Sequence, residues 1–386
     1  MLKKLSDGSS RIYGEAAFEV LAKAKDLERK GKNIIHFEIG EPDIETPENI
    51  AKAGIQAIKN KKTHYEPSIG IIELREAIQD EIEKTRGYRP DLEQVVITPG
   101  LKPGIFFSML TIINPKDEVI YQDPSYPTYG SVTSYQGAKE KFIPLLEEND
   151  FRINPDDIKK NINKKTKLII LNSPQNPTGS VIKKNELEEI SEIAEEFDIY
   201  IISDEIYSKM TYETSHHSVT SRDEAKKRTV LLDGFSKYYA MTGWRLGYMI
   251  TPVNMAKRLQ DFLVSSISCT ASFTQWAGLE ALTGNQDFIK DMMSRFKQKR
   301  DKIVNGLNSI NGFNCRLPKG AFYAFPNITK TGMNSEECAE YILHNAGVAC
   351  LPGTAFGASG EGYLRFSYAN SLQNIQNAIE RIKDCF

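Results

Sequence analysis

The sequence predicts an α/β protein whose larger domain is built on a mostly parallel sheet of seven strands. Between about residues 50 and 285, short apolar runs alternate with helical stretches, as in sheets whose parallel strands are connected by helices. Several of these runs are continuously apolar, as expected of strands that helices cover on both faces. The predicted strands are residues 95–97, 118–121, 141–143, 168–171, 200–202, 230–232 and 246–250.

One predicted helix, residues 186–197, shows a clear amphipathic pattern. Leu187, Ile190 and Ile193 fall on one face of a helix with 3.6 residues per turn, and the glutamates of this stretch mostly face water. Residues 100–102 are expected to precede a helix that follows the first strand. Further helices are expected at about residues 16–30, 105–113 and 287–310, and the last of these is long and heavily charged.

The length of 386 residues predicts two domains, because single hydrophobic cores stop growing at about 250–300 residues. The alternating pattern ends near residue 285, and short strands and helices are mixed beyond it. We therefore expect a large domain over residues 45–285. A smaller α+β domain is expected to combine residues 1–44 with residues 286–386, so that the N-terminal helix packs with the C-terminal part.

Composition argues against several classes of protein. The net charge is −2 and shows no basic excess, which disfavours a nucleic-acid or anionic-membrane surface. No stretch approaches 18 uninterrupted apolar residues, and the segment Met1–Gly8 lacks an apolar signal region. Neither a membrane-spanning helix nor a signal peptide is therefore expected.

The cysteines indicate a reducing compartment. There are five of them, an odd number, and no two have the C-x-x-C spacing. This pattern disfavours a disulfide framework and a zinc site, and we expect no metal. Reduced thiols in the cytoplasm are the expected state.

Polar or glycine-containing segments follow four of the predicted strands. In an open parallel sheet, ligands bind beyond the carboxyl ends of the strands. Four such segments on one rim therefore indicate a single site. The segments are residues 100–102, 172–179, 203–207 and 234–237.

Lys237 has the most distinctive chemistry among these residues. It lies just after a strand that looks buried, and Arg245 follows eight residues later. A lysine amine can form an imine with an aldehyde, and an arginine can bind two oxygens of a phosphate at once. Pyridoxal phosphate carries both groups, so the pair predicts this cofactor. The alternative is a solvated loop lysine with no chemical role.

Several short motifs occur in order along the chain. They are residues 40–43 (GEPD), 65–70 (YEPSIG), 74–77 (LREA), 176–179 (NPTG), 204–207 (DEIY), the segment 234–247 around Lys237, and 364–369 (LRFSYA). With these motifs the chain resembles the class I/II, fold-type I aminotransferases that depend on pyridoxal phosphate, of the aspartate aminotransferase kind. The resemblance covers nearly the whole chain.

The resemblance implies a role for each residue around the cofactor ring. Lys237 would form the Schiff base with the cofactor and then shuttle the α-proton, which requires a partly neutral amine. Asp204 would pair with the protonated pyridine nitrogen, although an aspartate in this position could also cap a helix. Asn176 and Tyr207 would hydrogen-bond the phenolic oxygen. Tyr126 would stack on the ring.

The resemblance also implies a phosphate site at the start of a helix. Backbone amides of Gly100, Leu101 and Lys102 would bind the phosphate, because amides at a helix N-terminus attract anions. Ser236 and Arg245 would complete this site.

The substrate and the partner subunit are assigned in the same way. Arg365 would hold the substrate α-carboxylate, with Asn176 and the backbone of Gly40 at the same end. Tyr65 would reach the phosphate of the neighbouring site in a homodimer. Lys102 matches a lysine that reads a distal carboxylate in one subgroup, but it could equally add positive charge near the phosphate or lie in solvent.

The function implied is a transaminase of amino-acid metabolism, with a biosynthetic role. An amino group would move from an L-amino acid to a 2-oxo acid by a ping-pong aldimine/ketimine mechanism. A pyridoxal-phosphate-dependent β-lyase or related elimination or synthase activity is the alternative, because motifs do not decide which bond breaks. A fused DNA-binding regulator, a Rossmann dehydrogenase and a P-loop NTPase are disfavoured, since their motifs are missing. Aromatic, acidic and aliphatic donors remain open.

Overall fold

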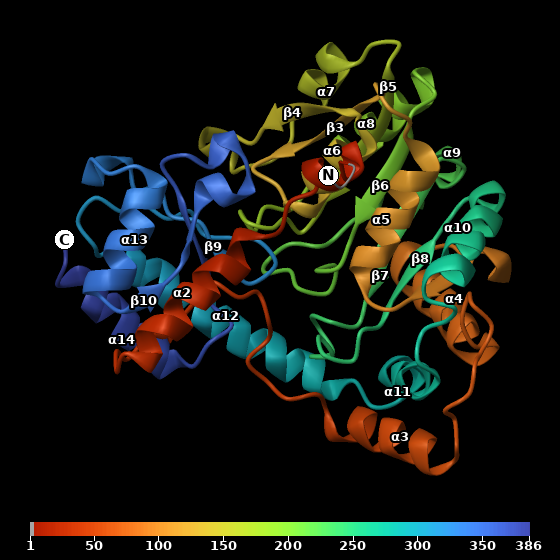
Figure 1. Ribbon diagram of the computed structural model, residues 1–386, viewed down its shortest axis with the longest axis horizontal. Helices are drawn as coiled ribbons and strands as arrows, with labels where there is room; N and C mark the ends of the chain where they lie inside the picture. The colour runs from red at the N-terminus through yellow and green to blue at the C-terminus, as the bar shows by residue number, and fades with distance from the viewer. Residues whose placement is uncertain (1–3) are drawn as a thin grey trace.

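A seven-stranded sheet forms the centre of the protein in a computed structural model that describes residues 4–386 (Figure 1). All seven predicted strands belong to it, in the order β2-β8-β7-β6-β5-β3-β4. Strand β8 pairs antiparallel with both of its neighbours, and the other pairs are parallel. The strands are β2 (Val95–Thr98), β3 (Glu118–Asp123), β4 (Lys139–Pro144), β5 (Thr166–Asn172), β6 (Tyr200–Asp204), β7 (Thr229–Gly234) and β8 (Gly247–Ile250).

Helices cover both faces of this sheet, which explains its continuously apolar strands. Side chains alternate across a strand, so Val230 faces one helical layer and Leu231 faces the other. One layer consists of α5 (Leu101–Ile112), α6 (Thr128–Gln136) and α10 (Val253–Ser266), and Figure 1 shows α5 and α10 on the near side. The other contains α4 (Ile72–Arg86), α7 (Pro155–Asn161), α8 (Lys184–Glu196), α9 (Asp223–Lys226) and α11 (Ser272–Thr283), with α3 (Glu48–Lys59) outside α11.

The predicted helices are present, but one begins earlier than expected. Helix α5 starts at Leu101, so residues 101 and 102 form its first turn and not a preceding loop. Gly100 ends the loop with a φ of 84°, a conformation that favours glycine. Pro103 is tolerated inside the first turn because the amides there have no intrahelical acceptor. The other predicted helices correspond to α2 (Ala16–Arg29), α8 and α12 (Asp287–Leu307).

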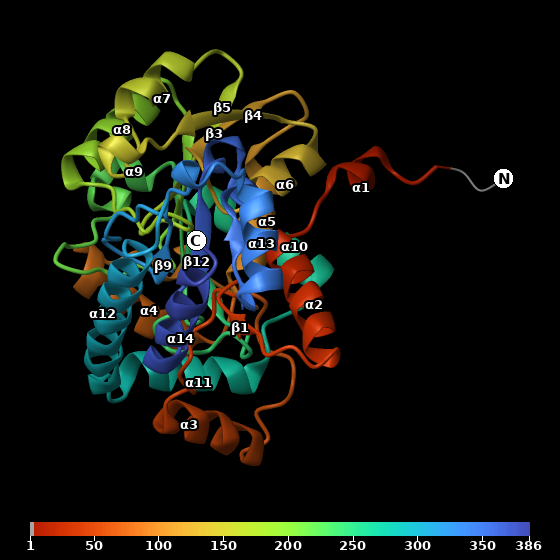
Figure 2. The ribbon, with the colours of Figure 1, turned by 90° about the vertical axis from the view of Figure 1, so that its left-hand side faces the viewer.

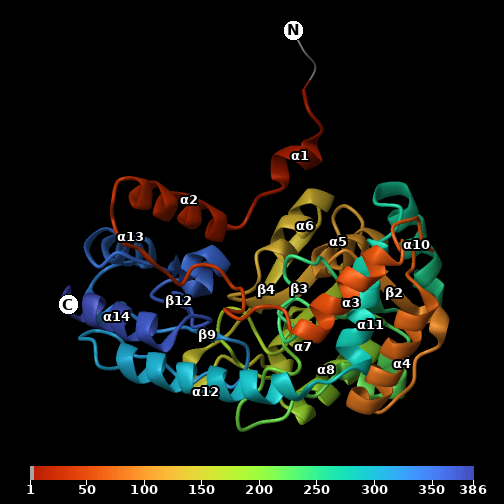
Figure 3. The same ribbon diagram turned by 90° about the horizontal axis from the view of Figure 1, so that it is seen from below.

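The remaining strands form two small sheets. Strand β1 (Ile35–His36) pairs parallel with β10 (Val348–Ala349). Strands β11 (Leu351–Pro352), β12 (Leu364–Ser367) and β9 (Tyr323–Ala324) form an antiparallel sheet in that order. Helices α13 (Ser335–Asn345) and α14 (Leu372–Lys383) lie beside them. As expected, α2 packs against this part of the chain, with Ala24 buried beside Leu343 and Ala349 (Figure 3).

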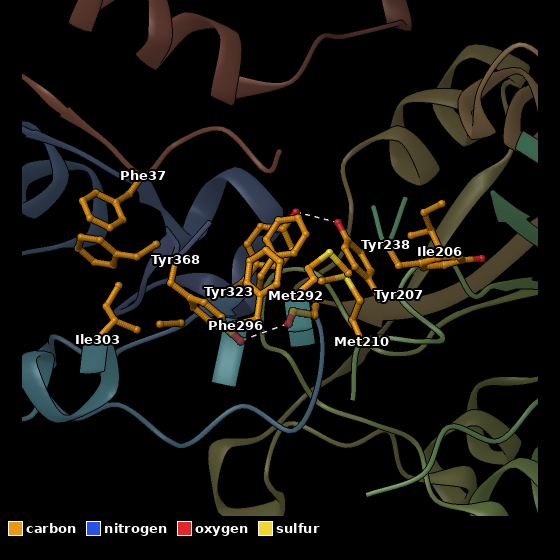
Figure 4. Close-up of a cluster of buried hydrophobic side chains, with 14 of the residues drawn as sticks. Phe37, Ile206, Tyr207, Met210, Tyr238, Met292, Phe296, Ile303, Tyr323 and Tyr368 are labelled. Atoms are coloured by element: carbon orange, nitrogen blue, oxygen red, sulfur yellow. Dashed lines mark hydrogen bonds between the residues drawn. The ribbon is translucent and has the colours of Figure 1, made fainter. Parts of the chain in front are cut away.

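A continuous set of buried side chains joins the large sheet to the small sheets (Figure 4). Tyr207, just beyond β6, meets Tyr323 of β9, and their hydroxyl oxygens are 2.7 Å apart. Phe296 of α12 stacks near them against Phe322, and Tyr368 continues the cluster beyond β12. The site at the end of the large sheet is therefore supported from the opposite side by a packed core.

The remaining elements, a short N-terminal helix and several 3₁₀ turns, lie outside the sheets. The short helix α1 (Asp7–Arg11) extends from α2 toward α6, where Arg11 Nε donates a 2.7 Å hydrogen bond to the carbonyl of Ser134 (Figure 2). In residues 4–386, no helix is both long enough and apolar enough to cross a membrane. Short 3₁₀ turns occur at Leu92–Gln94, Glu147–Asn149, Val219–Ser221, Thr329–Thr331, Gly353–Phe356 and Ala358–Gly360.

Candidate active site

A cavity of about 370 Å³ lies at the carboxyl ends of β5, β6 and β7 and is closed on the other side by residues near β9, β11 and β12. The sequence predicted that polar residues would meet at this rim, and most of them do. Tyr65 is outside the cavity, and Gly100 lies directly behind Arg245. The predicted residues that line the cavity are Gly40, Leu101, Lys102, Tyr126, Asn176, Asp204, Tyr207, Ser236, Lys237, Arg245 and Arg365.

Lys237 lines this cavity and is partly buried within it. Its Nζ donates a 2.7 Å hydrogen bond to the carbonyl of Gly40 and lies 5.8 Å from the centre of the Tyr207 ring. Burial and, to a smaller extent, the positive charge of Arg365 together lower the pKa of Lys237 to about 8. At pH 7 roughly one amine in ten is then neutral, compared with fewer than about one in a thousand for an ordinary lysine.

We expect this lowered pKa to be visible in the reactivity of the apoprotein. Competitive acetylation followed by mass spectrometry should show labelling of Lys237 rising through about pH 8, because only the neutral amine reacts. Exposed Lys159 is the control, since its ion pair with Glu196 raises its pKa. Labelling of Lys237 that rises only together with that of Lys159 would contradict the effect of burial and of Arg365.

Asp204 is buried at the end of β6, where its carboxylate faces the cavity floor. Its Oδ2 accepts a 2.7 Å hydrogen bond from the hydroxyl of Tyr129, and its Oδ1 accepts a longer one from the amide of Ile206. Residues 206–209 form a turn, so Asp204 does not cap a helix. Burial raises the pKa of Asp204 to about 6. A cationic ligand beside this carboxylate would favour its ionised form.

The N-terminus of α5 is a candidate anion site. The absence of a side chain at Gly100 allows Arg245 to approach, because an added Cβ would lie 2.3 Å from Arg245 Nη2. Arg245 is itself held by a 2.7 Å hydrogen bond from Nη1 to the carbonyl of Thr242. The first amides of α5, at Leu101 and Lys102, have no acceptor within the helix. A guanidinium beside such amides suits a phosphate.

Arg365 on β12 closes the opposite end of the cavity and is buried. Its Nη1 donates a 3.2 Å hydrogen bond to Asn176 Oδ1, and its Nη2 donates to the carbonyl of Glu38. The guanidinium carbon lies 4.6 Å from the ring centre of Tyr323 and 4.8 Å from that of Phe356. Its Nε is buried without an acceptor in the described structure. A carboxylate ligand would satisfy this group.

The sequence did not identify several residues of the cavity, among them Tyr129, Glu15, Tyr323 and Phe356. Tyr129 could have been noticed, because it lies one helical turn after Tyr126. Glu15, Tyr323 and Phe356 come from distant segments, and nothing in their local sequence marks them as part of a site.

Two predicted residues have surroundings that bear on their roles. Lys102 forms an ion pair with Glu15 and so has a partner of its own inside the cavity. Tyr65 is 87% exposed and contributes nothing to the cavity of its own chain. Across residues 4–386, no group of three or more histidine, cysteine or acidic side chains is arranged to hold a metal ion.

The fold and the cavity together place a partly buried lysine amine at the carboxyl end of an α/β sheet. Residues 32–382 match the model of the family Aminotransferase class I and II, and the chain belongs to this family. Enzymes of this family depend on pyridoxal phosphate. The lysine amine, the buried carboxylate and the anion site described above fit the aldehyde, the ring nitrogen and the phosphate of that cofactor.

Known proteins resemble this chain over nearly its full length. An aspartate aminotransferase of Pyrococcus horikoshii is 40% identical over 356 residues, which is 92% of this chain and 91% of that protein. Aromatic-amino-acid aminotransferase 2 of Thermococcus litoralis is 37% identical over 94% of each chain. The structure of the aspartate aminotransferase of Thermus thermophilus with maleate superimposes with a TM-score of 0.96, with 34% identity and complete coverage of both chains.

These matches confirm three predictions made from the sequence. The protein is an aminotransferase, its cofactor is pyridoxal phosphate and its fold is that of the fold-type I enzymes. The β-lyase alternative receives no support from them. The relatives are named for acidic and for aromatic substrates, so similarity alone does not identify the donor.

Proposed function

We propose that this aminotransferase exchanges an amino group between an L-amino acid and a 2-oxo acid in a ping-pong reaction, with Lys237 as the group that moves the proton. The observation that carries the proposal is the position of the Lys237 amine. It lies in one cavity with the buried carboxylate of Asp204 and the buried guanidinium of Arg365, and its pKa is lowered to about 8. A base poised near neutral pH is what proton transfer at this pH requires.

Pyridoxal phosphate, when bound, supplies an aldehyde that takes up the amino group and a ring that withdraws electrons from it. Arg245, the hydroxyl of Ser236 and the first amides of α5 would hold its phosphate. Asp204, oriented by Tyr129, would hold its ring nitrogen. Three further contacts are proposed: Asn176 and Tyr207 with the phenolic oxygen, and Tyr126 with the face of the ring.

Arg365 would have two functions in this arrangement. Its guanidinium would bind the substrate α-carboxylate, together with Asn176 and the backbone near Gly40. Its charge also lowers the pKa of Lys237 before the substrate arrives. When a carboxylate neutralises Arg365, this effect weakens and Lys237 becomes a stronger base. Lys237 Nζ would then take the proton from the substrate Cα.

A single-turnover experiment tests this function. The holoenzyme is mixed with one amino acid at a time, without an oxo acid, and the products are identified by mass spectrometry. We expect one equivalent of 2-oxo acid per site and no further turnover until an acceptor such as pyruvate is added. Continuous release of pyruvate and ammonia from a cysteine-type donor, without an acceptor, would indicate a lyase and contradict the proposal.

We also propose that the enzyme is a homodimer in which Tyr65 reaches the phosphate site of its partner. Tyr65 is exposed, so a partner subunit has access to it. Arg245 lines both the active-site cavity and a second cavity of about 730 Å³, which gives a segment of the partner subunit a route to the proposed phosphate site. Mixing inactive Lys237→Ala subunits with impaired Tyr65→Ala subunits should restore activity, because each hybrid dimer contains one intact site. A monomeric protein, or hybrids without restored activity, would contradict this arrangement.

The division into domains and the cellular location are further proposals. The seven-stranded sheet lies entirely within the proposed large domain, residues 45–285. The small sheets use strands from residues 35–36 and 323–367, in the proposed small domain, whose residues 1–3 lie outside the described residues. All five cysteines are free, which supports a reducing, cytoplasmic location for an enzyme of amino-acid biosynthesis.

A further inference from the structure

Glu15 brings a carboxylate into the active-site cavity from a segment far away in sequence. It precedes α2, and its side chain is only 20% exposed. Its Oε1 accepts a 2.8 Å hydrogen bond from the hydroxyl of Tyr126 and is also ion-paired with Lys102. The carboxylate is therefore held on the same wall as the lysine that the sequence had marked as a possible reader of a distal carboxylate.

Lys102 contacts this segment at the edge of the cavity, with 48% of its own side chain exposed. Besides the ion pair with Glu15, its Nζ lies 5.8 Å from the ring centre of Phe18 and 5.9 Å from that of Tyr126. The wall around this pair is otherwise mostly apolar. It includes Ala16, Ala17, Ile39, Leu101, Ile105 and Phe356.

The charges of the cavity leave no cation for a second substrate carboxylate. Under the function proposed above, Arg245 binds the phosphate, Arg365 binds the α-carboxylate, and Lys237 must act as a neutral amine. Only Lys102 remains, and Glu15 already neutralises it. A further carboxylate, that of Glu41, also lines the cavity.

We propose that Glu15 is a specificity-determining residue that selects substrates with large uncharged side chains, aromatic or aliphatic, over substrates with a distal carboxylate. A distal carboxylate at this wall would share one ammonium with Glu15 and would be repelled by it. An apolar side chain would instead be buried against Phe18, Leu101 and Ile105. The inference rests on the proposed placement of the α-carboxylate on Arg365, and it applies to donor and acceptor alike because both use one pocket in turn.

Unreactive substrate analogues test the inference without turnover. Dissociation constants of succinate, a dicarboxylate, and hydrocinnamate, a monocarboxylate with a phenyl group, are measured on the holoenzyme by calorimetry. We expect the native enzyme to bind hydrocinnamate more tightly. In Glu15→Gln, which removes the charge but keeps the shape, succinate should bind about tenfold more tightly and hydrocinnamate should change less than about threefold.

Three variants serve as controls for this shift. Glu15→Ser should give the same gain for succinate, so the result does not depend on one replacement. Adding Lys102→Ala to Glu15→Gln should abolish the gain, because the freed ammonium is its cause. Glu19→Gln removes an exposed carboxylate from the same helix, outside the cavity, and should leave both constants unchanged.

The half-reactions provide the second measurement and separate the two proposals. The ratio of kcat/KM for aspartate to that for phenylalanine should rise about tenfold in Glu15→Gln. The role of Glu15 is wrong, while amino transfer stands, if Glu15→Gln changes neither the ratio of the two dissociation constants nor the ratio of the two kcat/KM values. A native enzyme that prefers succinate and aspartate would contradict the role of Glu15 as well. If no donor yields a 2-oxo acid, the proposed function itself fails, whatever the analogues show.

Discussion

We expect Lys237→Ala to lose amino transfer almost completely, with a fall in rate of at least about 10⁴-fold. Positioned proton transfer alone contributes about 10²–10⁴-fold to an enzymatic rate, and this substitution also removes the amine that is proposed to bind the aldehyde of the cofactor. The measurement is single-turnover formation of 2-oxo acid, together with the visible absorbance of the bound cofactor. We expect both to be lost. Turnover that persists in Lys237→Ala without an added amine would contradict the role of Lys237.

Lys237→Arg is the matched variant that separates charge from reactivity. Arginine keeps a cation near Gly40 and Tyr207, but its guanidinium stays protonated and forms no Schiff base. We expect Lys237→Arg to be as inactive as Lys237→Ala. Circular dichroism and urea denaturation of both proteins should match the native enzyme closely. An active Lys237→Arg enzyme would show that positive charge, and not the amine, is what the site requires.

The largest loss of stability is expected from Arg86, which lies beneath the active site. Its Nη2 donates hydrogen bonds of 3.0 Å to Glu205 and 2.7 Å to Asp233, and all three side chains are at most 2% exposed. Glu205 follows Asp204, and Asp233 accepts a 2.8 Å hydrogen bond from Tyr238, which follows Lys237. We expect Arg86→Met to lower the free energy of unfolding by about 3–5 kcal/mol, because two buried carboxylates lose the guanidinium that they share.

Arg89→Ala is the control for this prediction. Arg89 belongs to the same segment and also pairs with two carboxylates, Asp80 and Glu83, but these ion pairs are exposed. Its removal should cost less than about 1 kcal/mol in urea denaturation of the apoprotein. Equal losses for Arg86→Met and Arg89→Ala would show that burial of the ion pairs does not determine their contribution.

The loss in Arg86→Met should also depend on pH. Burial alone would raise the pKa of Glu205, but the charges of His216 and Arg86 bring it down from 4.5 to about 2. A depressed pKa contributes stability above pH 4.5 that is lost as the pH falls toward 2. Without Arg86 this contribution shrinks, so the difference between the two proteins should be smaller at pH 4 than at pH 7. An equal difference in the free energy of unfolding at pH 4 and at pH 7 would show that lost packing, and not lost charge, destabilises Arg86→Met.

Much of the fold could be predicted because its signals are local. Apolar runs such as residues 168–171 marked buried strands, and all seven join one sheet. Since parallel strands end at a common rim, the residues after them could be expected to meet, and Asp204 and Lys237 do line one cavity. The start of α5 was placed too late: the helix begins at Leu101 and has Pro103 in its first turn, which accepts proline.

Other features depended on segments that meet only in the folded chain. Tyr129 binds Asp204 across 75 residues, and Glu15 binds Lys102 across 87. Arg86 meets Glu205 and Asp233 across more than 100 residues. A buried arginine and a solvated one have the same appearance in a sequence, since the desolvation that distinguishes them comes from distant side chains.

By itself, then, the sequence determined the α/β class, the family and the cofactor, and it singled out Lys237 as the residue proposed to carry the chemistry. Short apolar runs, and motifs whose residues lie near one another in the chain, indicate these properties. Only the tertiary structure decided how charge is distributed around that lysine: Arg365 near its amine, Tyr129 on Asp204, and Glu15 on Lys102. Electrostatic effects depend on distance and burial in the folded protein, and neither can be read from the order of residues.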